Sequence, residues 1–287
     1  MDSTFTYQKI KAYKLKMACS NRLTYCFLLF LSLIGSSIAA SPSDDLLAWV
    51  QQDNRRFLNA IIRVTNLNRT IKFYTENFGM KVLRQSDIPH ENYSYAVLGF
   101  GPEDSHFVLQ LRQNYGGEKL KLGTAFAHFG IATQDAYKMV EEIRARGGVI
   151  TREAGPIEGG TTVFAFIQDP DGYMFELIQR PPTPEPLCQL MLHFAIAMVG
   201  YGSNLTQITT VELRYNYNVT EYTEGNGYVQ VAINTDDVYK SAAAVELVSQ
   251  ELGGNITQGP DPISKTTSFL DPDGFKTVLV GNRRKKE

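Results

Sequence analysis

The sequence has few residues that could cross-link the chain, and no excess of one charge. Among its 287 residues are only 3 cysteines and 1 tryptophan, and the net charge is −2 at pH 7. This balance gives no indication of nucleic-acid binding, which depends on clustered Lys and Arg. Cys19 and Cys26 both lie in the first 40 residues. If that segment is removed, Cys188 remains alone, which excludes an intramolecular disulfide.

Long apolar runs are also scarce, apart from a short one near the N-terminus. Five basic residues precede the apolar run Cys26–Ile34, and Ser37 and Ala39 form a small-residue cleavage motif after it. The run is too short to span a bilayer, which needs about 20 residues. We therefore expect residues 1–40 to be a secretory signal, with a plastid transit peptide as the alternative, and the mature chain to have no membrane span.

Without this segment the chain holds 23 Lys and Arg against 29 Asp and Glu, a net charge of −6. An acidic protein that handles small molecules fits this balance. Five N-glycosylation acceptor patterns support secretion; they begin at Asn68, Asn92, Asn204, Asn218 and Asn255.

An internal repeat organises the remainder. Val108–Tyr115 recurs as Val211–Tyr217, Phe129–Lys138 recurs as Val231–Lys240, and the turn Asp169–Tyr173 recurs as Asp271–Phe275. Residues 181–186 are rich in proline and form a stiff linker. The repeat predicts two domains, each built from two modules.

Each module has alternating strand and helix patterns. In the first, strands are expected at 59–64, 81–84, 94–100 and 106–112, with an amphipathic helix at 70–78 opened by Asn68 and ended by Gly79. In the second, strands at 127–131, 149–152, 162–168 and 175–179 accompany a helix at 136–146. The sequence therefore predicts an α+β fold of tandem βαβββ modules.

The expected domain boundaries follow from the repeat. They are a signal at 1–40, a lead-in at 41–58, a first domain at 59–180, the linker at 181–186, a second domain at 187–283 and a basic tail at 284–287. The second domain lacks about 29 residues, because Gly99 lies 40 residues after Asn59 whereas Gly200 lies only 11 after Gln189. The apolar run 187–199 has no turn residue, so it can hardly supply both the first and third strands of its module.

Polar side chains occupy equivalent places in the first and last strands of the modules. The pairs are Asn59 and Gln110, His128 and Glu176, Gln189 and Glu212, and Gln230 and Val278. The second and third pairs offer one imidazole, two carboxylates and one amide, which suit a divalent metal. The first and fourth pairs carry no charge and no imidazole, so they predict a degenerate second site.

At these residues the chain resembles glyoxalase I of the plant, fused two-domain type, with the vicinal oxygen chelate fold. The resemblance covers about residues 44–283 and is strongest at Asp53–Phe57, Gly123–Gly130, Asp169–Tyr173 and Pro182–Gln189. It implies isomerisation of the hemithioacetal of methylglyoxal and glutathione to S-lactoylglutathione, in a site that holds nickel or zinc. The implied metal ligands are Gln189, Glu212, His128 and Glu176, with Glu176 as the base and Glu212 as the second carboxylate.

The resemblance also implies contacts with glutathione. The family's asparagine matches Asn216, and Asn114 in the degenerate half. The family's arginine matches Arg63 in the first module, whereas the active side carries His193 at that place. Because of the missing segment we expect impaired activity, and a monomer with a dimer as the alternative.

Two other functions share this fold. A non-catalytic small-molecule-binding protein would need the concave sheet but no metal, and the shortened module favours it. An iron-dependent dioxygenase would need two histidines and one carboxylate, but only His128 is expected in a first strand.

Overall fold

The computed structural model describes residues 42–116, 118–157, 160–180, 194–202, 208–216, 219 and 221–282. The chain divides into two compact units, one formed by the residues up to Arg55 together with those from Ile233 onward, and the other by Arg56–Ala232. In the described part of the chain, no helix is long and apolar enough to cross a membrane.

The first module of the unit Arg56–Ala232 has the predicted order βαβββ. Its elements are β1 (Phe57–Arg63), α3 (Leu67–Phe78), β2 (Lys81–Ile88), the short 3₁₀ helix η2 (Pro89–Glu91), β3 (Tyr93–Gly99) and β4 (Val108–Asn114). The strands pair in the order β2-β3-β4-β1, and β1 is parallel to β4. Leu109 and Leu111 on one face of β4 are buried in the core, so the alternate residues, including Gln110, face the opposite side.

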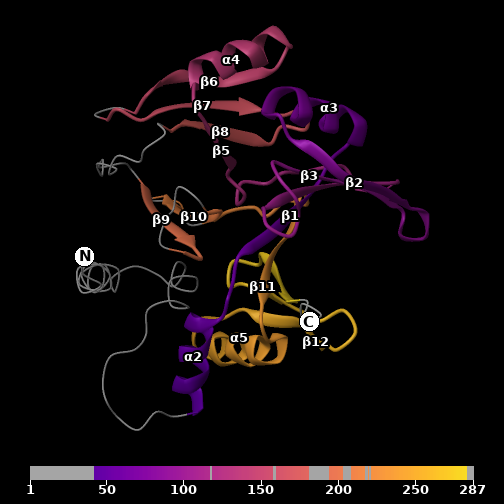
Figure 1. The fold of residues 1–287 in the computed structure, drawn as a ribbon, viewed down its shortest axis with the longest axis vertical. Helices are drawn as coiled ribbons and strands as arrows, with labels where there is room; N and C mark the ends of the chain where they lie inside the picture. The colour runs from indigo at the N-terminus through magenta and orange to yellow at the C-terminus, as the bar shows by residue number, and fades with distance from the viewer. Residues whose placement is uncertain are drawn as a thin grey trace. The chain divides into compact units, whose positions relative to one another are not determined.

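The second module repeats this arrangement. Its elements are β5 (Phe129–Thr133), α4 (Ala136–Ala145), β6 (Val149–Pro156), β7 (Val163–Gln168) and β8 (Met174–Gln179), paired as β6-β7-β8-β5. Figure 1 shows α4 lying over this sheet. The two modules share one core, because the ring of Phe175 packs 4.8 Å from Phe78 and 5.4 Å from Tyr74 between centroids.

The start of α3 differs from the sequence-based expectation. Asn66, not Asn68, is the N-cap, and its side chain accepts a hydrogen bond from the Arg69 amide. Leu67 is 4% exposed and belongs to the buried stripe, so the helix has to begin before it. The predicted end is confirmed, because Gly79 closes the helix with a left-handed φ of 71°.

The third module contributes two described strands, β9 (Phe194–Gly200) and β10 (Thr210–Asn216), as an antiparallel pair. Phe194 pairs with Asn216 just as Tyr93 pairs with Asn114 in the first module. Therefore β9 occupies the place of a third strand. Among the described residues no strand lies beside β10 as β1 lies beside β4.

The other unit contains the fourth module and a helix that the sequence did not predict. Helix α2 (Pro42–Gln52) lies within the expected lead-in. Strand β11 (Tyr228–Thr235) crosses the unit boundary, and α5 (Val238–Leu252), β12 (Asn255–Asp261), β13 (Thr266–Leu270) and β14 (Lys276–Gly281) follow, with β13 pairing antiparallel with both β12 and β14.

A buried ion pair fastens the end of α2 to α5. Arg55 Nε donates to Asp53 Oδ2 at 2.7 Å, and Arg55 Nη2 donates to Ser241 Oγ at 3.0 Å. The Asp53 carboxylate also accepts from Thr235 Oγ1 at 2.6 Å and from the Asp236 amide at 2.8 Å. A buried ion pair is tolerated when its remaining donors and acceptors are satisfied in this way. The motif Asp53–Phe57 thus has a structural role.

Candidate active site

Two connecting segments that are equivalent in the repeat cross one another. One joins β4 to β5 and leads to His128, and the other joins β10 to β11. Their backbones approach so closely that a Cβ on Gly123 would lie 2.2 Å from the Thr223 carbonyl oxygen, and one on Gly225 would lie 2.4 Å from that of Lys121. Both glycines have positive φ, 72° and 70°. The amide of Thr124 donates to the Thr223 carbonyl at 2.7 Å. The crossing therefore fixes the segment that leads into β5.

His128 immediately precedes β5 rather than lying in it, which corrects its expected place inside a first strand. Two residues earlier, the ring of Phe126 packs on Phe129 and Tyr228 with centroid distances of 4.9 and 5.6 Å. The imidazole itself stands edge-on to Phe166 at 5.5 Å. Phe166 therefore packs against the imidazole, and the contacts of Phe126 hold the segment that precedes it.

Glu176 comes from the neighbouring strand β8, where it pairs with Gly130 of β5 and Phe166 of β7. Its Oε2 lies 3.2 Å from His128 Nε2, and the two side chains are 19% and 12% exposed. A strand buried in a core normally carries apolar residues, so a carboxylate here signals a site.

Glu212 on β10 completes a cluster. One ligand atom from each of His128, Glu176 and Glu212 lies within 4.8 Å of the others, and among the described residues this is the one group with such geometry. Burial raises the pKa of the Glu212 carboxyl above its ordinary value, and so does the Glu176 carboxylate, whereas His128 and Arg214 lower it. Two partly buried carboxylates and an imidazole match the donors of a divalent metal, whose charge would offset both.

Comparisons with known proteins agree with this chemistry. The model of the Glyoxalase/Bleomycin resistance protein/Dioxygenase superfamily matches residues 56–177. A lactoylglutathione lyase of Arabidopsis thaliana is 52% identical over 276 residues, covering 85% of this chain and 97% of the relative.

The chain belongs to the lactoylglutathione lyase family.

Two further relatives extend the match. A second Arabidopsis thaliana protein, a probable lactoylglutathione lyase described as chloroplastic, is 50% identical, covering 86% of this chain and 79% of the relative. The crystal structure of glyoxalase I from Zea mays has a TM-score of 0.74 and 52% identity, covering 81% of this chain and 94% of that chain. The fold is therefore the vicinal oxygen chelate fold of this lyase family, as the resemblance implied.

The other ligand and glutathione residues predicted for a lactoylglutathione lyase have different outcomes. Gln189 and His193 lie outside the described residues. Asn216 lies four residues after Glu212 on β10, and its Nδ2 donates to Tyr222 Oη at 3.0 Å. Arg63 donates to the main-chain oxygens of Glu118 and Asn226, so its guanidinium joins the two segments that cross before β5 and β11.

The residues of the predicted degenerate site lie partly together. Asn59 and Gln110 are on the paired strands β1 and β4, and Gln230 is on β11. Val278 lies on β14 in the other unit. Asn59 Oδ1 is buried without a hydrogen-bond partner in the described part of the chain. None of these residues offers a charged ligand. Asn114, at the end of β4, accepts from Arg112 Nε at 3.0 Å.

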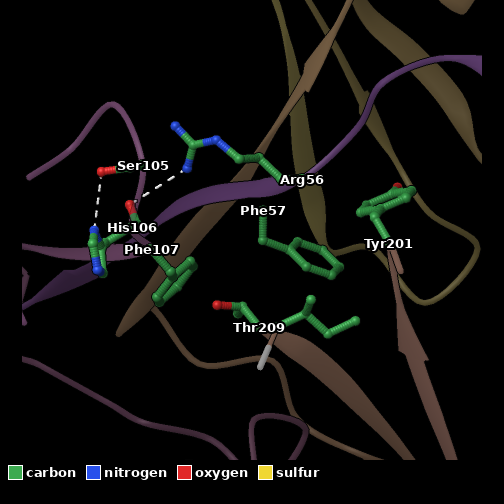
Figure 2. A pocket seen from close by; sticks show the side chains of 8 residues that line it. Arg56, Phe57, Ser105, His106, Phe107, Tyr201 and Thr209 are labelled. Atoms are coloured by element: carbon green, nitrogen blue, oxygen red, sulfur yellow. Dashed lines mark hydrogen bonds between the residues drawn. The ribbon is translucent and has the colours of Figure 1, made fainter. Parts of the chain in front are cut away.

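A pocket of 370 Å³ lies apart from the cluster, at the ends of the β3–β4 and β9–β10 hairpins. Figure 2 shows Arg56 pointing toward the His106 carbonyl rather than into open space. Arg56 Nη2 also donates to the carbonyls of Glu103 and Asp104 at 3.0 and 2.7 Å. The Arg56 guanidinium therefore ties the start of β1 to the loop between β3 and β4.

Sequence analysis did not single out Arg214, a charged residue near the cluster. Arg214 lies two residues after Glu212 and so projects from the same face of β10. Its Nε donates to Asn216 Oδ1 at 2.9 Å. The repeat contained the signal, because Arg112 stands in the equivalent place before Asn114.

Proposed function

We propose that the chain is a metal-dependent lactoylglutathione lyase, which isomerises the methylglyoxal–glutathione hemithioacetal to S-lactoylglutathione. The observation that carries the proposal is the cluster of His128, Glu176 and Glu212. It lies in a chain that is 52% identical to a lactoylglutathione lyase over most of its length.

Nickel or zinc would be held by these three side chains, with Gln189 as the fourth candidate ligand. When bound, a divalent cation stabilises the negative charge that develops on the substrate oxygens as a proton leaves carbon. Imidazole nitrogen and carboxylate oxygen are suitable donors for either ion.

The protein's own part in the reaction is to move a proton from one carbon of the substrate to the next. The hemithioacetal carbon loses its proton to the adjacent ketone carbon, and the hydroxyl proton of the first carbon passes to the ketone oxygen. The first carbon thereby becomes the thioester carbonyl and the second becomes an alcohol. No external oxidant is required. We assign the transfer to the Glu176 carboxylate, and Glu212 remains as the second carboxylate. The 3.2 Å contact with His128 supports this role, because it orients Glu176 at the site.

Lyase activity is expected to be lower than that of the full-length relatives. We propose domains at 59–180 and 187–283, and the second of these is the shortened one. Strand β4 has β1 as a neighbour, but among the described residues no such strand lies beside β10. Gln189, the predicted ligand of that first strand, lies outside the described residues. A less firmly held Glu212 predicts weaker metal binding.

The direct test measures S-lactoylglutathione formation from methylglyoxal and glutathione with added nickel or zinc. We expect Glu176→Gln to lower kcat by about 10²–10⁴-fold, the usual contribution of a positioned acid–base group. Glu153→Gln is the matched control, since this carboxylate is exposed and pairs with Arg144. Equal activity in wild type and Glu176→Gln would refute the role of Glu176.

The second candidate is a non-catalytic small-molecule-binding protein of the same fold. The short third module favours it. A folded chain that binds a glutathione thioether but forms no S-lactoylglutathione, even with saturating metal, would establish this alternative.

We also propose that residues 1–40 direct the chain into the secretory pathway, where glycosylation would follow. The acceptors Asn68, Asn92 and Asn255 are exposed. A fluorescent fusion of residues 1–40 distinguishes secretion from plastid import, which the chloroplastic relative favours. A mobility shift of the full chain on enzymatic deglycosylation tests the sugars. For the assembly state we propose a monomer, and sedimentation would detect a dimer.

A further inference from the structure

Glu176 stands in a row of residues that crosses the sheet of the second module, and one member of that row is a glycine. In the register of the strands, Gly130 of β5 lies beside Glu176 of β8, which in turn lies beside Phe166 of β7. The next residues along β5 and β8, Ile131 and Leu177, are buried in the core. Because side chains alternate between the two faces of a strand, the row lies on the opposite face, which is the face of the proposed metal site.

The fold itself gives no reason for a glycine at position 130. Gly130 is not among the glycines with positive φ, so its backbone conformation suits any residue. An added Cβ would have one described atom within 4 Å, Ile178 Cδ1 at 3.7 Å, which is an ordinary van der Waals contact. A glycine inside a strand weakens the strand, and it often marks a place that a ligand approaches closely. Gly130 is exposed, so the space in front of it is open to a ligand.

The repeat contains a filled version of the same row. In the first module Ile61 lies beside Gln110, which in turn lies beside Val97. Ile61 therefore occupies the place of Gly130, and Gln110 occupies the place of Glu176. The open place is thus found beside the carboxylate and not beside the amide.

We propose that Gly130 is a specificity-determining residue, and that the open place beside Glu176 receives the substituent of the 2-oxoaldehyde, which is a methyl group in methylglyoxal. This assignment rests on the proposed function, which puts the hemithioacetal at the cluster. Glu176 can move a proton between two carbons only if both lie against its carboxylate. The group attached to the second carbon then lies beside Glu176 as well. Of the two neighbours of Glu176 in the row, Phe166 is bulky, whereas Gly130 leaves room.

The test is the substrate selectivity of Gly130→Ile, which gives the row the side chain that Ile61 supplies in the first module. The value of kcat/KM is measured with the glutathione adducts of methylglyoxal and of phenylglyoxal, whose substituent is larger. We expect kcat/KM to fall about tenfold for the methylglyoxal adduct and about 100-fold for the phenylglyoxal adduct, since a small misfit in a pocket costs about 10–200-fold. Gly130→Ala should lower mainly the phenylglyoxal value, by about threefold.

Gly155→Ile is the matched control. Gly155 lies on β6 of the same sheet, its φ is also not positive, and an added Cβ there would have no described atom within 4 Å. This variant should keep the wild-type ratio of kcat/KM for the two adducts.

Two further measurements distinguish a blocked substrate place from a damaged fold or metal site. Gly130→Ile and Gly130→Ala should retain as much nickel as wild type. Their urea midpoints should stay the same or rise, because a side chain replaces a glycine inside a strand. A glycine that is needed for the fold would give lower midpoints.

Binding of unreactive thioethers separates this inference from the lyase activity. In calorimetry, Gly130→Ile should weaken the binding of S-benzylglutathione about tenfold more than that of S-methylglutathione. If wild type forms no S-lactoylglutathione but the variant shows this difference, the lyase proposal fails and the inference stands.

The inference is overturned if Gly130→Ile keeps the wild-type selectivity between the two adducts and between the two thioethers, or if Gly155→Ile alters it as much. Loss of nickel or a lower urea midpoint in both Gly130 variants would also overturn it. A wild type with neither lyase activity nor thioether binding would refute the inference together with the proposed function.

Discussion

The β3–β4 and β9–β10 hairpins come from equivalent stretches of the repeat but differ in what covers them. Strand β4 lies between β1 and β3, whereas β10 pairs with β9 alone among the described residues. Val97 on β3 is 1% exposed, and its equivalent Met198 on β9 is 44% exposed. The β3–β4 hairpin is therefore covered on the face of Val97 and carries no charged ligand there. The β9–β10 hairpin carries one charged ligand, Glu212, and has an open face.

The two DPDG turns show the same contrast. In the first repeat the Asp171 carboxylate accepts bonds from Thr65, Arg69 and Thr70 at the start of α3. The second repeat lacks the segment equivalent to α3. The carboxylate of Asp273, the equivalent residue, has no hydrogen-bond or ion-pair partner in the described part of the chain. The turn Asp271–Phe275 is thus present without the partners that its equivalent has in the first repeat, among the residues that the structure describes.

The largest effect on stability is expected where the two linkers cross. Gly123→Ala places a Cβ 2.2 Å from the Thr223 carbonyl oxygen at a positive φ. We expect a loss of about 4 kcal/mol in the free energy of unfolding, from the combined steric and left-handed strain. Gly116→Ala is the control, because Gly116 also has positive φ but nothing within 4 Å. Urea denaturation measures both, and equal losses would show that the crossing is not tightly packed.

The second prediction compares the turns directly. Asp171→Ala should cost about 3–4 kcal/mol, because its side chain is 1% exposed and several donors, among them buried Thr70, lose their acceptor. Asp273→Ala should stay within about 0.5 kcal/mol of wild type. Thermal or urea unfolding of both variants tests this. A large loss in Asp273→Ala would mean that this carboxylate has partners after all.

The third prediction concerns pH. Burial raises the pKa of Asp169 to about 6, although Tyr74 and two backbone amides donate to its carboxylate. An unfolded aspartate titrates near ~4. Since the folded state holds this proton more tightly, its contribution to stability is complete below pH ~4 and is lost as pH rises through about 6.

Asp169→Asn should therefore remove a decline in stability of at most about 3 kcal/mol over this pH range. Unfolding free energies of both proteins between pH ~4 and ~7 measure the difference. Parallel profiles would contradict the assignment to Asp169, because all other titrating groups are common to the two proteins.

The smallest effect distinguishes the two asparagines at the start of α3. Asn66→Ala should cost about 1 kcal/mol, the usual value for a lost N-cap. Asn68→Ala should cost less than about 0.5 kcal/mol, because Asn68 is exposed inside the first turn. If the order of the two losses is reversed, the helix begins where the sequence pattern first suggested.

The modules were predictable because packing imposes a period on the sequence. The stripe of Tyr74 and Phe78 identified α3, and Gly79 identified its end. The cap was misassigned because Asn66 and Asn68 flank one leucine, and only the burial of Leu67 decides between them. Helix α2 was missed since it precedes the repeat and has no equivalent to reveal it.

The cluster was predictable for a different reason. His128, Glu176 and Glu212 are ionisable residues at places where the repeat has Gln230, Val278 and Gln110. The crossing of Gly123 and Gly225 was not predictable, because it joins residues 102 apart whose contact is steric.

Metal stoichiometry tests the central claim most directly, namely that Glu212 of the shortened third module completes a metal site with His128 and Glu176 of the second module. The purified chain, dialysed against nickel or zinc, should retain one ion per chain. Glu212→Gln should weaken or abolish retention, while Gln110→Asn, at the equivalent place in the other half, should leave it unchanged. A chain that retains no metal, or one that loses it in Gln110→Asn but not in Glu212→Gln, would contradict the account.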